Sequence, residues 1–174
     1  MSDEPLESRF PGEYFDTISL IFVLEHIADP VAFLRHLKRF LKPGGKIVVL
    51  VPNYLDPLVN LYDIGAFRSF YFCIEHLYYF TPQTIESVFN KAGLRGVIET
   101  LQEYPLSNHI NWAFRQKPSD TLAARSGLPD IELIDGAPLD PWKRLWDQMD
   151  VLYRRFLSDN GYGDRIWAEI SIKH

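Results

Sequence analysis

The stretch of residues 15–53, FDTISLIFVLEHIADPVAFLRHLKRFLKPGGKIVVLVPN, restricts the fold of this chain more than any other. Residues 18–24 form an almost unbroken apolar run, which predicts a parallel strand buried on both faces. Asp29 is a good N-cap with Pro30 at the first helical position, and apolar residues at helical spacing then predict a helix of about three turns. The Pro-Gly-Gly sequence at 43–45 predicts the end of this helix, and residues 46–51 predict a second short strand. The order strand, helix, strand predicts a right-handed crossover between parallel strands.

The rest of the chain predicts further helices and strands. Residues 81–93 begin with a Thr-Pro pair and end with glycine, which predicts a capped helix, and residues 94–104 predict the strand that follows. An Asp-Pro pair at 140–141 predicts another helix, whose bulky apolar stripe from Trp142 to Phe156 is typical of a core or a subunit contact. Residues 107–138, in contrast, are rich in turn formers and weak in periodicity. Residues 165–172 alternate apolar and more polar side chains, which predicts a final strand.

Three of these segments together resemble a known family. FDTISLIFVLEHIADP, then LKPGGKIVVLVPN, and later EHLYYFTPQTIESVFNKAGL are similar to the fourth strand, fourth helix, fifth strand and following helix of class I S-adenosylmethionine-dependent methyltransferases. The resemblance implies an α/β fold with a partial Rossmann-like sheet, in which the strands of the family follow the order 4-5-7-6, with flanking helices and a helical insertion. We therefore expect one domain over residues 1–174, with its core at 14–104, a helical insertion at 105–160 and the final strand at 161–174.

The resemblance also implies S-adenosylmethionine as the cofactor, held across the carboxyl ends of the first four strands. In the family, a Gly-rich loop after the first strand and an acidic residue at the end of the second hold the methionine part and the ribose. Before Phe15 the sequence reads only MSDEPLESRFPGEY, which has no glycine-rich turn and no room for a βαβ unit of about 30 residues. We therefore expect the C-terminal part of a methyltransferase domain, which alone binds the cofactor weakly or not at all and shows no turnover.

The candidate site residues follow the first strand. By position in the motif, the resemblance implies that Leu20, Ile21, Phe22 and His26 border the cofactor. Methyl transfer from a sulfonium mainly requires alignment and the removal of a proton. His26 and His76 each follow a glutamate, and a neutral imidazole suits a general base at physiological pH, so we predict both as catalytic residues. The alternative is that both histidines cap strand ends or bond the backbone.

A metal site is a further alternative at the same position. Some ubiquinone-pathway and small-RNA methyltransferases carry Glu-x-x-Glu-His after this strand and hold a divalent cation there, with oxygen and imidazole ligands suited to such ions. In this chain Phe22 stands where the first glutamate would be, which leaves Glu25, His26 and His76 as candidate ligands. We predict no metal in this site.

Composition and charge exclude several classes of partner. The chain has 174 residues, of which 47% are hydrophobic, enough for one buried core. A net charge of -5 and a pI of about 5.5 argue against nucleic acid, because phosphate neutralisation needs a basic face. Cys73 has no second cysteine to pair with, and no signal peptide or apolar span of about 18 residues is visible. We expect a cytoplasmic protein with neither a nucleic-acid nor a membrane partner.

Two classes of function fit this sequence. The first is a methyltransferase for a small-molecule, sugar or lipid-like acceptor, and the second is a non-catalytic partner-binding module derived from one. A nicotinamide dehydrogenase is disfavoured because no Gly-x-Gly-x-x-Gly follows any predicted strand. One edge of the strand at 18–24 is expected to lack a neighbour, and an apolar open edge pairs with other chains. We therefore expect a homodimer or a partner chain at this edge.

Overall fold

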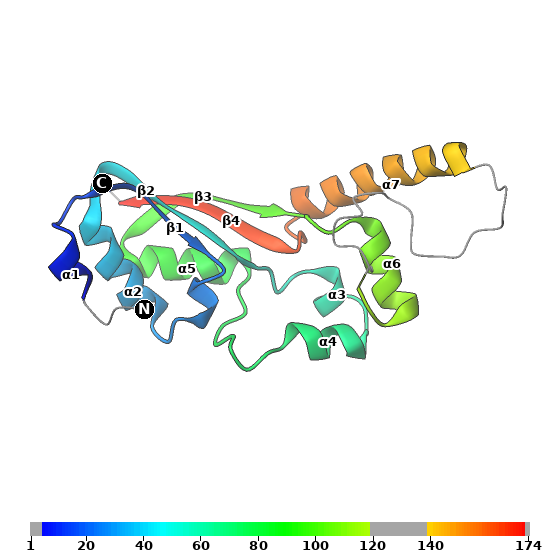
Figure 1. The fold of residues 1–174 in the computed structure, drawn as a ribbon, viewed down its shortest axis with the longest axis horizontal. Helices are drawn as coiled ribbons and strands as arrows, with labels where there is room; N and C mark the ends of the chain where they lie inside the picture. Colours follow the sequence, from blue (N-terminus) through cyan, green and yellow to red (C-terminus); the bar gives the residue numbers. More distant parts are fainter. Residues whose placement is uncertain (1–4, 119–138, 173–174) are drawn as a thin grey trace. The chain divides into compact units, whose positions relative to one another are not determined.

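The computed structural model describes residues 5–118 and 139–172. These residues group into two compact units. Unit 1 comprises residues 5–52, 75–99 and 166–172, and unit 2 comprises residues 53–74, 100–118 and 139–165. Most of a four-stranded sheet belongs to unit 1 (Figure 1). The single domain expected from the sequence stays a prediction.

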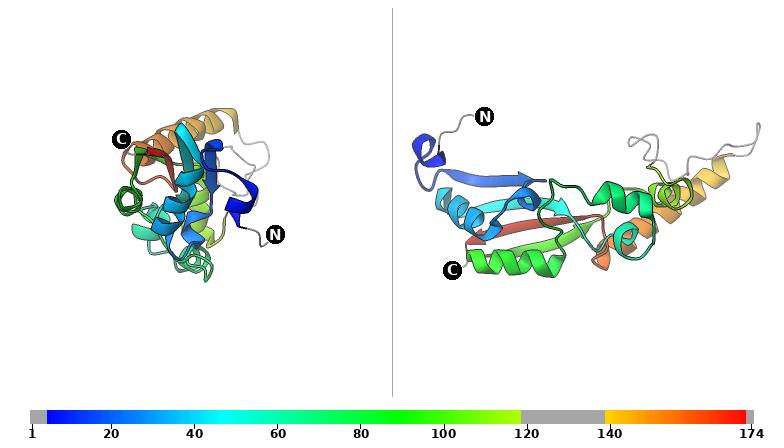
Figure 2. Two further views of the ribbon diagram at one scale, coloured as in Figure 1. Left: turned by 90° about the vertical axis from the view of Figure 1, so that its left-hand side faces the viewer. Right: turned by 90° about the horizontal axis from the view of Figure 1, so that it is seen from below.

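The sheet has the strand order β1-β2-β4-β3. Its strands are β1 (Phe15–Ile21), β2 (Leu41–Pro52), β3 (Leu94–Leu101) and β4 (Arg165–Ile172). β1 and β2 are parallel, with Ile18 opposite Ile47 and Leu20 opposite Val49. β4 runs in the direction opposite to β1 (Figure 2). Lys46 of β2 forms an ion pair with Glu169 of β4 at 2.7 Å. β1, β2, β4 and β3 correspond to the family's strands four, five, seven and six, so the predicted strand order is confirmed. The final strand predicted at residues 165–172 is also confirmed.

β1 differs from the predicted strand at residues 18–24. It begins at Phe15 and ends at Ile21, because Phe22 adopts a φ of 53° and leaves the extended conformation. Burial on both faces is also wrong. Leu20 is buried, whereas its neighbours Ser19 and Ile21 are exposed. The reason is that β1 lies at the edge of the sheet, with α2 and α5 on one face of it (Figure 1).

Between β1 and β2, the helix is shorter than predicted, and the strand that follows it is longer than predicted. α2 (Pro30–Leu37) begins as expected, with the Asp29 side chain accepting from the Ala32 N–H at 2.9 Å. A 3-10 turn, η2 (Lys38–Phe40), follows, so the Pro-Gly-Gly sequence lies inside β2 instead of ending the helix. The pairing of β1 with β2 shifts between Phe15 and Thr17, which accommodates the extra residues as an irregularity.

α2 and α5 (Pro82–Ala92) pack side by side against the sheet (Figure 1). The caps of α5 are as predicted: Thr81 and Thr84 form a reciprocal capping box, and Gly93 ends the helix with a φ of 74°. Arg35 and Lys38 donate to the carbonyl oxygens of the last turn of α5. The core between helices and sheet is apolar, and its fully buried members include Leu34, Ile47, Ile85, Phe89 and Ile166. Each such side chain contributes about 1.5–3 kcal/mol by leaving water.

Unit 2 is largely helical. Its helices are α3 (Pro57–Asn60), α4 (Gly65–Tyr71), α6 (Leu106–Arg115) and α7 (Leu139–Asp159), whereas α1 (Leu6–Arg9) belongs to unit 1. α7 confirms the predicted helix, but α6 was not predicted, and residues 119–138 lie outside the described part. The core of this unit is built from Leu58, Val59, Ile64, Phe67 and Trp112. Phe67 is therefore a core residue of this unit, and the aromatic side chains of Tyr54 and Tyr71 pack against the same core.

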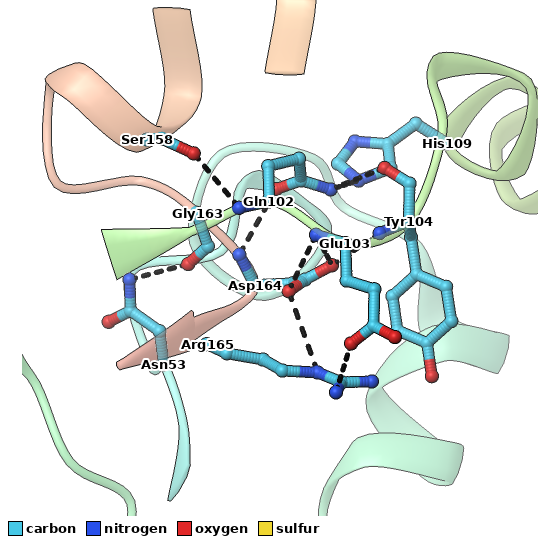
Figure 3. A network of polar contacts seen from close by, with 9 residues as sticks. All are labelled: Asn53, Gln102, Glu103, Tyr104, His109, Ser158, Gly163, Asp164 and Arg165. Carbon is cyan, nitrogen blue, oxygen red and sulfur yellow. Dashed lines mark hydrogen bonds and ion pairs between the residues drawn. The ribbon is translucent and has the colours of Figure 1, made fainter. Parts of the chain in front are cut away.

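A buried polar network lies in unit 2 beside the ends of β3 and β4 (Figure 3). The Asp164 carboxylate accepts from the backbone N–H groups of Glu103 and Tyr104, and the Asp164 N–H donates to Gln102 Oε1 at 3.0 Å. The Asn53 amide donates to the Gly163 oxygen at 2.7 Å. Burial raises the pKa of the Asp164 carboxyl to about 6, against the opposing effect of these backbone donors.

Candidate active site

β1 ends at a sharp change of backbone direction. Its last pair joins Ile21 to Leu50 of β2, and the Phe22 N–H still donates to the Leu50 oxygen at 2.8 Å. Phe22 has a φ of 53°. This left-handed conformation is unusual for a bulky residue, costs on the order of 1–3 kcal/mol, and is found most often at functional sites. The chain therefore leaves the sheet through a strained residue.

The predicted cofactor-binding residues at this turn differ in accessibility. Leu20 is buried in the core of unit 1, so its side chain is not available to a ligand. Ile21 and Phe22 are 44% and 39% exposed at the carboxyl end of β1. The accessible apolar surface beside the strand end is therefore formed by Ile21 and Phe22.

The next segment, η1 (Leu24–His26), is tied to a distant part of the sequence. The backbone N–H groups of Leu77 and Tyr78 donate to the Glu25 carbonyl oxygen at 2.9 and 3.2 Å. The Tyr78 hydroxyl donates to the Ala28 carbonyl oxygen at 2.9 Å. These bonds hold the segment containing His76 beside His26, so the structure brings both predicted catalytic residues together.

The hydrogen bonds of His26 define which of its nitrogens carries the proton. His26 Nδ1 lies 2.7 Å from the backbone oxygen of Glu75. A carbonyl oxygen can only accept, so Nδ1 carries the proton of the neutral ring and Nε2 is unprotonated. Nε2 lies 4.0 Å from Glu25 Oε1, and the His26 side chain is 38% exposed. The basic nitrogen is therefore accessible to a ligand.

Two further polar side chains accompany His26: Glu25, which is buried, and His76, which is half-buried. The Glu25 side chain is 1% exposed, and neither of its carboxyl oxygens has a hydrogen-bond partner within the described residues. Burial raises the pKa of Glu25 above its ordinary value. His76 packs edge-on against His26 with ring centroids 4.8 Å apart, and burial lowers its pKa, with His26 adding to the decrease. Unpartnered buried polar groups are uncommon and point to a role that involves a ligand, water or ion.

The same three side chains also form a possible metal ligand set. Among the described residues, one ligand atom each from Glu25, His26 and His76 lies within 4.8 Å of the others. A carboxylate with two imidazoles is a set that zinc and related metals accept. The prediction that no metal binds here stays a prediction. The sequence analysis named Glu25 only as a candidate metal ligand and not among the catalytic or cofactor-binding residues, although a glutamate directly after an apolar run was the signal for it.

Comparisons with known proteins identify the family. The sheet corresponds to the part of the class I Rossmann-like methyltransferase fold that holds the fourth to seventh strands of the family, and two solved structures share it. A S-adenosylmethionine-dependent methyltransferase from Thermotoga maritima matches with a TM-score of 0.53 and 17% identity over 94% of this chain and 58% of its own. One from Archaeoglobus fulgidus matches with a TM-score of 0.50 and 18% identity over 99% and 66%. A family model described as a methyltransferase domain matches residues 2–99. The chain belongs to this methyltransferase domain family.

Curated relatives are similar over shorter stretches. The ubiquinone/menaquinone biosynthesis C-methyltransferase UbiE of Proteus mirabilis is 43% identical over 64 residues, which are 36% of this chain and 26% of the relative. The UbiE of Vibrio campbellii is 36% identical over 102 residues, or 57% of this chain and 35% of the relative. The chain thus spans about a quarter to a third of these relatives. Within the described residues, no helix combines the length and the apolar character needed to cross a membrane.

Proposed function

We propose that this chain takes part in S-adenosylmethionine-dependent methyl transfer to a small-molecule, sugar or lipid-like acceptor. Membership of the methyltransferase family supports the proposal. The observation that carries it is the His26–His76 pair beyond the carboxyl end of β1, where open α/β sheets bind ligands. S-Adenosylmethionine supplies an activated methyl group, so the protein needs to align the acceptor and to remove one proton.

In this proposal His26 is the general base. The Glu75 carbonyl oxygen holds the ring by Nδ1, and Nε2 takes the O–H or N–H proton of the acceptor. The imidazolium that forms lies 4.0 Å from Glu25 Oε1, and an ionised Glu25 stabilises it in this buried setting. His76 stays neutral and packs against the ring, so that it limits the orientations His26 can adopt.

The residues at the carboxyl end of β1 are suited to contact one side of the methyl donor. Ile21 and Phe22 offer exposed apolar surface at the strand end. The sequence before β1 contains no Gly-rich turn for the methionine part. We therefore expect the isolated chain to be inactive and to bind S-adenosylmethionine with a dissociation constant above about 1 μM, which corresponds to a binding free energy weaker than about -8 kcal/mol. Calorimetry that returns a micromolar dissociation constant contradicts this expectation.

The test of the proposed reaction uses the chain and a version extended in frame by the DNA upstream of Met1. Each protein is incubated with methyl-tritiated S-adenosylmethionine and a metabolite extract, and labelled small molecules are counted. Only the extended protein is expected to transfer label. In it, His26→Ala is expected to lower kcat by about 10²–10⁴-fold. His36→Ala on α2 is the matched control. An upstream sequence without a strand and Gly-rich turn, or full activity of His26→Ala, refutes the proposal.

A second candidate function is that of a non-catalytic partner-binding module. The open edge of β1 favours it, because Tyr14, Ile21 and Phe22 are exposed along this strand and its flanks. A homodimer or another protein chain can pair with such an edge. An extended protein that binds S-adenosylmethionine poorly, transfers no label and forms a stable complex through β1 supports this second function instead of the first.

A further inference from the structure

Unit 2 contains a cavity of about 430 Å³ within its own residues. Its volume lies in the range of small-molecule pockets, which begins at about 300 Å³. Rings and aliphatic side chains form most of its wall, including Leu55, Pro57, Leu61, Phe156, Leu157 and Tyr162. Tyr62 and Tyr153 also line it and bring hydroxyl groups to this apolar surface. The cavity is therefore suited to a flat apolar molecule that carries a polar group.

A chain of hydrogen bonds reaches the cavity from the buried network beside β4. Gln102 Oε1 accepts from the Asp164 N–H at 3.0 Å, and Gln102 Nε2 donates to the Tyr104 oxygen at 2.8 Å (Figure 3). These two bonds fix the orientation of the amide. Gln102 Nε2 also lies 3.2 Å from His109 Nε2, which must then be the accepting nitrogen. The proton of the neutral His109 ring is therefore on Nδ1.

The proton positions can be followed outward from His109. Burial lowers the pKa of this histidine to about 4, so its ring is neutral. Nδ1 donates to the Tyr153 hydroxyl at 2.8 Å. The Tyr153 oxygen therefore accepts from His109, and burial, followed by the neighbouring Tyr62, raises the pKa of Tyr153. Tyr62 is 38% exposed and lines the cavity, so its O–H is available to a ligand.

We propose that this cavity binds a small aromatic molecule with one hydrogen-bond-accepting oxygen, which takes its bond from the Tyr62 hydroxyl. The ring walls select a flat apolar body, and the Tyr62 hydroxyl selects the oxygen. Gln102, His109 and Tyr153 form the hydrogen-bonded chain behind this part of the cavity and do not touch the ligand oxygen. All of these residues lie in unit 2. The inference is therefore independent of the proposed methyl transfer at His26.

The experiment compares two probes that differ in one oxygen, 2-acetylnaphthalene and 2-ethylnaphthalene. Their affinities for the whole chain are measured by ligand-observed NMR titration. The acetyl probe is expected to bind at one site about 5–10-fold more tightly, which is the usual worth of one hydrogen bond. Tyr62→Phe is expected to remove this preference and leave the affinity of the ethyl probe unchanged. Tyr14→Phe, which changes an exposed tyrosine of unit 1, is the control.

A second variant separates the site from general effects on folding. Leu61 lines the cavity and is 72% exposed, so Leu61→Trp is expected to fill the entrance without disturbing the core. The Leu61→Trp variant is expected to bind both probes at least about tenfold more weakly than the wild type does. The proposal is overturned if neither probe binds saturably, if both bind the wild type equally, as a purely apolar lipid-tail site would, or if Tyr62→Phe keeps the preference for the acetyl probe.

Discussion

Replacing Asp56 with asparagine is expected to change the way stability depends on pH. Asp56 caps α3, where its Oδ1 accepts from the Leu58 N–H at 2.8 Å. The residue is 3% exposed. Burial raises the pKa of its carboxyl from 3.8 to about 7, and the Asp164 carboxylate adds to this increase against the Leu58 hydrogen bond. The native protein therefore holds a proton on a group that an unfolded chain has already ionised.

The size of the effect follows from this difference in pKa. Between about pH 4 and pH 7 the folded state binds more protons at Asp56 than the unfolded state, so stability falls as pH rises through this window. One pKa unit corresponds to about 1.4 kcal/mol, and a shift of roughly three units corresponds to about 4 kcal/mol. Asparagine is neutral at every pH and is an equally good N-cap. We expect Asp56→Asn to match the wild type near pH 4 and to be more stable by about 4 kcal/mol at pH 8.

Other buried groups of unit 2 titrate in the same range, so the measurement must be a difference. The raised pKa of Asp164, about 6, has the same sign as that of Asp56. His109 has the opposite sign, because its folded pKa of about 4 lies below the ordinary value of 6.5 and its contribution is lost as pH falls. These contributions are present in both proteins. The difference between wild type and Asp56→Asn therefore reports on Asp56 and its interaction with Asp164.

The assay is urea unfolding followed by circular dichroism at intervals from pH 4 to pH 8. Asp63→Asn is the control, because the Asp63 side chain is 93% exposed and its loss removes a carboxylate without changing a buried one. The free energies of unfolding of wild type and Asp56→Asn are expected to diverge steadily above pH 4. Parallel curves for these two proteins would refute the reasoning that burial holds the proton on Asp56.

Three further predictions test the sheet, its edge and the histidine site. Gly96→Ala is expected to destabilise the protein by at least about 3 kcal/mol in thermal unfolding, because an added Cβ would lie 1.8 Å from a carbonyl oxygen of β4. In the control Gly65→Ala, the added Cβ meets nothing within 4 Å. Equal stabilities of the two variants would contradict the close approach of β3 to β4. Light scattering is expected to give a mass above 20.3 kDa, and Ile21→Lys to return it to the monomer, whereas a wild-type monomer at high concentration contradicts pairing at the β1 edge. Added Zn²⁺ is expected to leave the melting temperature unchanged, and a rise that both Glu25→Gln and His76→Ala abolish would instead demonstrate a metal site.

Local sequence signals were sufficient for much of the fold. The Thr-Pro start and glycine end of α5 depend only on backbone groups within a few residues, and both were predicted correctly. The alternation in β4 likewise gave its bounds, because successive side chains in a strand face opposite sides. The strand order followed from the family resemblance and not from periodicity. α6 was missed because its sequence, LSNHINWAFR, buries polar residues such as Asn108 and His109, which a search for an apolar stripe overlooks.

The sites depend on contacts between distant parts of the chain, which only the tertiary structure decided. His26 and His76 are each visible in the sequence as a histidine after a glutamate, but their contact exists because Leu77 and Tyr78 bond the backbone of η1. In unit 2, His109 meets Tyr153 of α7 at 2.8 Å across 44 positions of sequence. Residue type determined which groups were able to carry chemistry. Packing determined which of them lost water, and with it their pKa values and the directions of their protons.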